Sequence, residues 1–147
     1  MHVCVDDHSR LAYAELRPDE KAITATCFLI RAAAWLGHHG ITVRRVMTHN
    51  GSCYRAYLFD TAGQSLGARQ ARPRPCTPRT NGKAERFIQS SIKERAYKRA
   101  YQSSEKRPER LGPWLGYYNQ ARPHSALNYK PPISRLENCE QRPAKNT

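Results

Sequence analysis

The sequence predicts an α/β domain in which helices cover a mixed sheet. Three observations indicate this class. Short alternating or β-branched runs occupy residues 2–6, 11–16 and 41–48. Apolar residues recur at helical spacing between the second and third of these runs, and again from residue 83 to about residue 100. Strand and helix signals therefore alternate along one chain of ordinary domain size.

The first two strands are predicted to form a hairpin. Residues 2–6 alternate Val3 and Val5 with less apolar residues, and residues 11–16 form a second run. The intervening residues 7–10, with the sequence DHSR, supply turn chemistry. An antiparallel pair is expected.

A helix is predicted after Pro18 and Asp19, ending near Gly37 or Gly40. The apolar positions that recur at i, i+4, i+7 and i+11 are Ile23, Cys27, Ile30 and Ala34. This spacing is typical of a helix.

The run at 41–48 predicts a third strand that delivers His49 at its carboxyl end, before the Asn-Gly turn at residues 50–51. A helix over residues 54–66 and a short strand over residues 68–72 are expected to follow. This order places His49 at one edge of the sheet.

The second half begins with a proline-containing loop, after which residues 83–100 predict a long helix. The residues that fall near one face of it are Glu85, Ile88, Ile92 and Ala96. Glu85 is therefore expected to point towards the core. A shorter helix is predicted over residues 111–118, followed by a proline-interrupted tail.

Charge is the strongest compositional signal. The chain has 25 Lys and Arg against 12 Asp and Glu, a net charge of +13 and a pI near 10.0. Residues 69–110 hold 13 basic and 4 acidic residues, a net charge of +9. We interpret this excess as a surface for a polyanion, with nucleic acid as the first choice. The alternative is a basic protein whose charge only maintains solubility.

Composition also argues against several classes of protein. Mean hydropathy is −0.81, yet 39% of the residues are hydrophobic and they gather in periodic runs, which favours a folded domain over disorder. No run approaches the roughly 18 apolar residues of a membrane span, and no signal-peptide pattern opens the chain, so a cytoplasmic protein is expected. Five separated cysteines without a C-x-x-C pair argue against a disulfide framework or a structural zinc site.

Three positions are candidates for an active site: Asp6, His49 and Glu85. The first two follow predicted strands and the third lies early in a helix, so all three can meet at one edge of the sheet, and 35 residues separate His49 from Glu85. Phosphoryl transfer on DNA uses two divalent ions about 4 Å apart, which carboxylates hold. Many surface acids also follow strands, so this placement alone does not identify a function.

The sequence motifs around these positions resemble those of the integrase core of insertion-sequence transposases, whose acidic triad is Asp, Asp, Glu. The segments that carry the resemblance are VDDHSR, THNGSCY, TPRTNGKAERF and YNQARPHSALNYKPPISRLE, and together they span about residue 2 to residue 137. The resemblance implies a ribonuclease H-like fold, a five-stranded mixed sheet flanked by helices. It also implies a catalytic core over residues 1–100, a C-terminal helical and proline-rich extension over residues 101–147, and homo-oligomers.

In such a core, Asp6, the residue at position 49 and Glu85 would be catalytic, with Asp6 and Glu85 as ligands of magnesium or manganese in a two-metal site. This chain departs from the pattern because His49 stands where the family has Asp. Imidazole is neutral and a poor magnesium ligand. Three interpretations follow: a former ligand without a role, a site retuned to manganese or another softer ion, or an impaired activity.

The resemblance also implies an N-terminal helix-turn-helix region that reads the ends of the element, and we expect that region to be missing, since the chain starts at the first predicted strand. The expected DNA-binding residues flank Glu85 and are Arg79, Asn81, Lys83, Arg86 and Lys93. The alternative for the basic ones is a solvated helix face, and Asn81 can equally cap the helix.

The function predicted from the sequence is that of a DNA-binding integrase core for metal-dependent strand transfer, impaired by His49. The alternative is a non-enzymatic DNA-binding fragment that acts through mixed oligomers with a full-length transposase.

Overall fold

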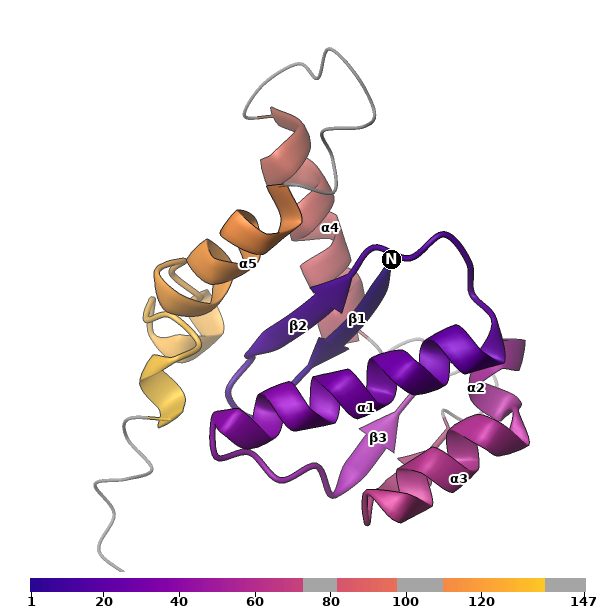
Figure 1. Cartoon of the computed structure of the whole chain (residues 1–147). Coiled ribbons are helices and arrows are strands. Elements are labelled where there is room, and N and C mark those ends of the chain that lie inside the picture. Colours follow the sequence, from indigo (N-terminus) through magenta and orange to yellow (C-terminus); the bar gives the residue numbers. More distant parts are fainter. Residues whose placement is uncertain (73–81, 98–109, 137–147) are drawn as a thin grey trace, which may run out of the picture.

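The computed structural model describes residues 1–72, 82–97 and 110–136, and it has the α/β character that the sequence predicts (Figure 1). In chain order the elements are β1 (His2–Val5), β2 (Ala12–Glu15), α1 (Ala22–His38), β3 (Arg45–Met47), α2 (Ser52–Arg55), α3 (Tyr57–Ser65), β4 (Arg69–Ala71), α4 (Gly82–Tyr97), α5 (Leu111–Gln120) and the short 3-10 helix η4 (Ser125–Leu127).

The four described strands form two separate two-stranded sheets. Strands β1 and β2 pair antiparallel, with Val5 opposite Ala12, which confirms the predicted hairpin. Strands β3 and β4 pair parallel, with Val46 beside Gln70. The expected five-stranded sheet is therefore not formed by the strands of the described residues.

Most predicted elements are confirmed, with differences at their boundaries. The run at 41–48 forms a strand only over Arg45–Met47, because its partner β4 is itself only three residues long. The helix predicted over 54–66 is two helices, α2 and α3, separated at Ala56, whose ψ of 141° is extended rather than helical.

The hairpin lies between two helical layers, as the period-2 alternation of strands requires. On one face, the ring of Phe28 in α1 lies 5.4 Å from that of His2 and 5.7 Å from that of Tyr13. On the other face, Ala12 and Ala14 join the core formed by α4 and α5, whose large buried side chains are Phe87, Leu111, Trp114 and Tyr118.

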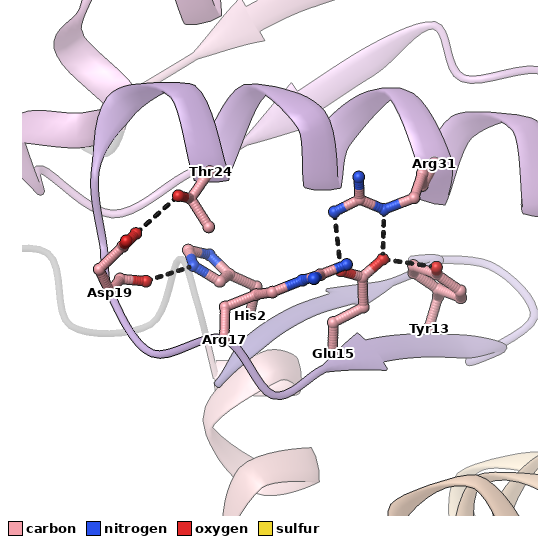
Figure 2. Close-up of polar contacts among 7 residues, drawn as sticks. All are labelled: His2, Tyr13, Glu15, Arg17, Asp19, Thr24 and Arg31. Atoms are coloured by element: carbon pink, nitrogen blue, oxygen red, sulfur yellow. Dashed lines mark hydrogen bonds and ion pairs between the residues drawn. The ribbon is translucent and has the colours of Figure 1, made fainter.

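Helix α1 is tied to β2 by a network of charged groups around Glu15 (Figure 2). The Glu15 carboxylate accepts hydrogen bonds from Arg31 Nε at 2.7 Å, from Arg17 Nε at 2.8 Å and from the Tyr13 hydroxyl at 2.6 Å. The Arg31 bonds, above all, lower the pKa of Glu15 to about 2. The network therefore favours an ionised Glu15 at the surface where helix and strand meet.

The start of α1 is fixed by Asp19, also drawn in Figure 2. Its carboxylate accepts hydrogen bonds from Thr24 Oγ1 at 2.6 Å and from the Lys21 backbone N–H at 3.2 Å. Its backbone carbonyl lies 3.2 Å from His2 Nε2 on β1. The residue thus links the beginning of the helix to the first strand, near the start predicted at Pro18 and Asp19.

Helix α1 also covers the second sheet. Ala25 and Leu29 pack with Cys53 of α2 and Phe59 of α3, and Val46 of β3 packs against this cluster. A single helix therefore lies over both sheets, and the two sheets share one helical layer on this side (Figure 1).

The outer edge of β2 is closed by α5. The buried side chain of Asn119 accepts a hydrogen bond from the Ala12 N–H at 2.9 Å and donates one to the Ala12 carbonyl at 2.8 Å. The Asn119 carbonyl in turn accepts a bond from the N–H of Ile133 at 3.0 Å. This chain of contacts ties the C-terminal part of the described chain to the first hairpin.

Candidate functional site

Asp6 directly follows β1 and holds the turn of the hairpin. Its Oδ2 accepts hydrogen bonds from the backbone N–H and the hydroxyl of Ser9, both at 2.7 Å. Ser9 is fully buried, and its oxygen accepts a further bond from the Leu11 N–H at 3.1 Å. Arg10 completes the turn with a positive φ of 69°. One carboxylate oxygen of Asp6 therefore has a structural role in the turn.

His49 lies two residues beyond β3, at the carboxyl end of the strand, as predicted. It is exposed, and its Nδ1 accepts a hydrogen bond from the Gly51 N–H at 3.0 Å. The Tyr54 ring stands edge-on to the imidazole at 4.8 Å. Because Nδ1 accepts, we assign the ring proton to Nε2.

Gly51 lies close to this ring. A Cβ atom on Gly51 would lie 2.7 Å from His49 Cε1 and 3.0 Å from His49 Nδ1. The backbone makes no demand for glycine, since the φ of Gly51 is −60°. A side chain at position 51 would therefore require the exposed His49 ring to turn away.

Glu85 lies in the first turn of α4 and is exposed, so the expectation that it faces the core is wrong. The buried positions of this helix are Phe87 and Ser91. Phe87 lies 5.3 Å from the ring of Trp114 and 4.8 Å from that of Tyr118. Burial of this aromatic side chain turns the helix so that Glu85 faces solvent.

Within the described residues, which include Asp6, His49 and Glu85, no three His, Cys, Asp or Glu side chains form a group that could hold a metal ion. At the three predicted positions, one oxygen of Asp6 is bonded to Ser9, His49 presents an imidazole, and Glu85 faces solvent. The imidazole at position 49 does not fit magnesium, which prefers hard oxygen ligands.

Three of the predicted DNA-binding residues, Lys83, Arg86 and Lys93, are exposed on α4. Lys83 Nζ donates to the backbone carbonyl of Asp7 at 3.1 Å and forms an ion pair with the Asp7 carboxylate, whose side chain is 88% exposed. The start of α4 therefore lies beside the turn of the first hairpin. Arg79 and Asn81 lie outside the described residues.

Four further exposed arginines lie on and beside β3 and β4, and these are Arg44, Arg45, Arg69 and Arg72. Arg45 and Arg69 are neighbours in the parallel register, an arrangement in which like charges repel. The sequence signal that was missed is the pair Arg44-Arg45 in the middle of the third predicted strand, since Arg69 and Arg72 belong to the basic segment 69–110. Neighbouring positive charges such as those of Arg45 and Arg69 favour a polyanion.

No helix among the described residues is long and apolar enough to cross a membrane. The cysteines Cys4, Cys27 and Cys53 are free, in agreement with the absence of a disulfide framework among them.

Comparison with known proteins identifies relatives of the chain. Residues 66–132 match the family described as "Integrase core domain". The chain is 34% identical over 92 residues to the putative transposase InsD for insertion element IS2E of Escherichia coli (strain K12), which covers 58% of this chain and 39% of that protein. Over the same length it is 34% identical to the transposase InsD for insertion element IS2A/D/F/H/I/K of Escherichia coli, covering 29% of it. The chain thus spans less than two fifths of these relatives.

Two solved structures share the fold. The catalytic core domain of BIV integrase superposes with a TM-score of 0.71 at 21% identity, covering 94% of this chain and 85% of that one. A chain of the simian T-cell lymphotropic virus intasome in complex with PP2A regulatory subunit B56 gamma superposes with a TM-score of 0.77 at 21% identity, covering 99% and 49%. The described residues therefore have the fold of integrase catalytic cores.

Proposed function

Because the chain carries an integrase core of the kind found in insertion-sequence transposases, we propose that it binds duplex DNA through α4. The observation that carries the proposal is the placement of three exposed cations, Lys83, Arg86 and Lys93, on this helix. Positions i, i+3 and i+10 lie on one side of a helix, so their charges can follow one phosphate backbone.

The arginines beside β3 and β4 support the same proposal. They are four exposed positive charges of a chain whose net charge is +13. Cations that contact phosphates give affinity without reading the base sequence. We therefore expect binding with little sequence preference.

We propose that DNA strand transfer, the chemistry implied by the resemblance, is impaired in this chain. Two observations support this: a histidine at position 49, where the family has Asp, and the absence of a group of three possible metal ligands among the described residues. The catalytic roles of Asp6, His49 and Glu85, and a dependence on magnesium or manganese, stay predictions. We also propose that the core contains the five-stranded mixed sheet that the resemblance implies.

The second candidate function is a non-enzymatic fragment that binds DNA and forms mixed oligomers. It is favoured by the same lack of a ligand cluster, and by Ile23 and Ile30, which are 55% and 47% exposed on α1 and lie seven residues apart. Residues at this spacing share one helix face, which a second subunit could cover. Light scattering of the purified chain, alone and mixed with a full-length relative, distinguishes this function.

The experiment for DNA binding is fluorescence anisotropy with a labelled duplex of arbitrary sequence at salt concentrations between about 50 and 200 mM. Affinity should fall steeply with salt. The triple variant Lys83→Ala, Arg86→Ala, Lys93→Ala should bind more weakly. For this variant, the slope of log affinity against log salt concentration should be smaller in magnitude by roughly 1 for each phosphate contact removed.

Lys21→Ala is the matched control, because Lys21 is exposed at the start of α1, on the other side of the hairpin from α4. It should leave the slope unchanged. An affinity that does not depend on salt, or equal slopes for the triple variant and the unmodified chain, would contradict the proposal.

A further inference from the structure

Tyr129, which lies two residues beyond η4, presents its ring to solvent. Its exposed fraction is 75%, and among the described residues its side chain has no hydrogen bond and no aromatic neighbour. Tyr118, by contrast, is 5% exposed, and its ring lies 4.8 Å from that of Phe87 and 4.7 Å from that of His124. Packing in the core therefore does not account for an aromatic residue at position 129.

The backbone that carries Tyr129 is held in place by its own hydrogen bonds. The His124 carbonyl accepts from the N–H of Leu127 at 2.9 Å and from that of Tyr129 at 2.8 Å, and the His124 N–H donates to the Lys130 carbonyl at 3.3 Å. The side chain of Leu127 is buried beneath this loop. The loop of residues 124–130 thus presents the ring from a fixed backbone, which lowers the entropy lost when the ring binds a ligand.

The conformation of Tyr129 is one that bulky residues rarely adopt. Its φ is 59°, and that of Asn128 before it is 55°, so two successive residues are left-handed. Asparagine and glycine enter this region readily, whereas a larger side chain is strained there. A strained residue whose side chain is exposed suggests that the side chain has a role outside the fold.

Charge indicates what the ring binds. The described segment 110–136 contains no Asp or Glu, and its charged residues are Arg110, Arg122, Lys130 and Arg135. Lys130 follows Tyr129 directly and is exposed. An aromatic ring beside a cation is the combination that binds single-stranded nucleic acid, because the ring stacks on a base while the cation neutralises a phosphate.

We propose that Tyr129 stacks on an unpaired base of single-stranded DNA and that Lys130 contacts a neighbouring phosphate. In a duplex the bases stack on one another, so their faces become available at a single-stranded end or an unpaired segment. The inference rests on the proposed function in taking DNA as the polyanion, but it uses other residues than the contact proposed for α4.

Tyr57 shows that exposure alone does not predict such a contact. It is 85% exposed, but as the first residue of α3 it has a helical backbone without strain. Asp60 lies in the same first turn, and its negative charge repels phosphate. Tyr57 is therefore the matched control for Tyr129.

The test is fluorescence anisotropy of the full chain with a labelled single strand of about 16 thymidines. Tyr129→Gly should lower the affinity for this strand by about fivefold or more, and Tyr129→Trp should keep it. Tyr57→Ala should leave the affinity unchanged. Because glycine adopts a positive φ freely, Tyr129→Gly should not lower the melting temperature, which separates a lost contact from a damaged fold.

Two further measurements separate the base from the phosphate. On a strand of the same length made of abasic sites, Tyr129→Gly should bind as the unmodified chain does. On the oligothymidine, Lys130→Ala should reduce the slope of log affinity against log salt concentration by roughly 0.7 in magnitude, while Tyr129→Gly should leave the slope unchanged.

Three results would overturn the proposal. The first is that the oligothymidine does not bind, or binds the unmodified chain and Tyr129→Gly equally. The second is an equal loss of affinity on the abasic strand, which would mean that Tyr129 does not stack on a base. The third is a dimer in light scattering that Tyr129→Gly dissociates, which would assign the ring to a second copy of the chain.

Failure of this inference is distinguishable from failure of the proposed function. The triple variant of α4 is measured on a blunt duplex, where Tyr129→Gly should have no effect. If that duplex binds as proposed and the oligothymidine does not distinguish Tyr129→Gly from the unmodified chain, the role of Tyr129 is wrong and the role of α4 stands.

Discussion

Asn119 hydrogen-bonds twice to the backbone of Ala12, a residue 107 positions earlier in the chain. The carboxamide presents one acceptor and one donor, as a peptide group does, and therefore takes the place of a neighbouring strand at the β2 edge. Both partners are buried, so neither the Ala12 N–H nor its carbonyl has water as an alternative.

Asn119→Ala should destabilise the chain by about 2–4 kcal/mol, because it removes two hydrogen bonds and leaves two buried backbone groups unpaired. Asn119→Asp should also destabilise it, since a carboxylate cannot donate to the Ala12 carbonyl. Urea unfolding measures both effects. The control is Gln120→Ala, an exposed neighbour on the same helix, which should change the free energy of unfolding by less than about 0.5 kcal/mol.

Glu15 should make stability depend on acidic pH. Its folded pKa is lowered to about 2 from an ordinary value of 4.5, chiefly by the hydrogen bonds from Arg31. A lowered pKa means that this contribution is complete above about pH 4.5 and is lost as the pH falls towards 2. Glu15→Gln should therefore destabilise the chain at neutral pH by on the order of 1 kcal/mol. The free energy of unfolding of this variant should also depend less on pH in the range between these two values.

The matched control for Glu15 is Glu20→Gln, because Glu20 is an exposed carboxylate close to the same helix. Its unfolding profile against pH should follow that of the unmodified chain. If Glu15→Gln followed it as well, the ion pair with Arg31 would contribute nothing to stability.

Asp7 should compete with DNA for Lys83. The exposed ion pair partly neutralises one of the three cations proposed to contact phosphates. Asp7→Asn should therefore raise the affinity for duplex DNA a few-fold at low salt, and the gain should shrink as salt screens the charges. Anisotropy titrations measure this, with Glu20→Gln as the control for loss of a negative charge elsewhere. An equal gain from both variants would show a general charge effect.

His49→Asp should preserve the fold, because an aspartate can accept the Gly51 N–H that His49 Nδ1 accepts now. The substitution alone should not create a magnesium site, since Asp6 is held by Ser9 and Glu85 faces solvent. Thermal unfolding and calorimetry with magnesium check both statements. Magnesium binding that appears in this variant and disappears on adding Glu85→Gln would instead support the predicted triad.

Local patterns in the sequence were sufficient to predict most of the helices and strands. The alternation of Val3 and Val5 gave the first strand, and the Asn-Gly turn after the third strand placed His49 at its end. These features depend on near neighbours in the chain, which is why they can be recognised without the fold.

Features that depend on distant contacts could not be recognised in the same way. The phase of α4 is set by the packing of Phe87 on Trp114 and Tyr118, whereas the spacing of Glu85 and Ile88 suggested a different buried face. The sequence motif around Asp6 suggested a metal ligand and gave no sign that its carboxylate accepts a hydrogen bond from Ser9 in the hairpin turn. A motif gives the identity of its residues, while tertiary packing decides which way they face.

The contact between His49 and Gly51 has a consequence for how the chain can change over generations. The imidazole ring, in its present orientation, occupies the place of a Cβ atom at position 51, while the backbone there accepts any residue. Because the ring is exposed, it can turn away when alanine stands at position 51, but the hydrogen bond from the residue-51 N–H to Nδ1 is then lost. The order of substitutions therefore matters: alanine at position 51 requires less rearrangement once a smaller side chain stands at position 49.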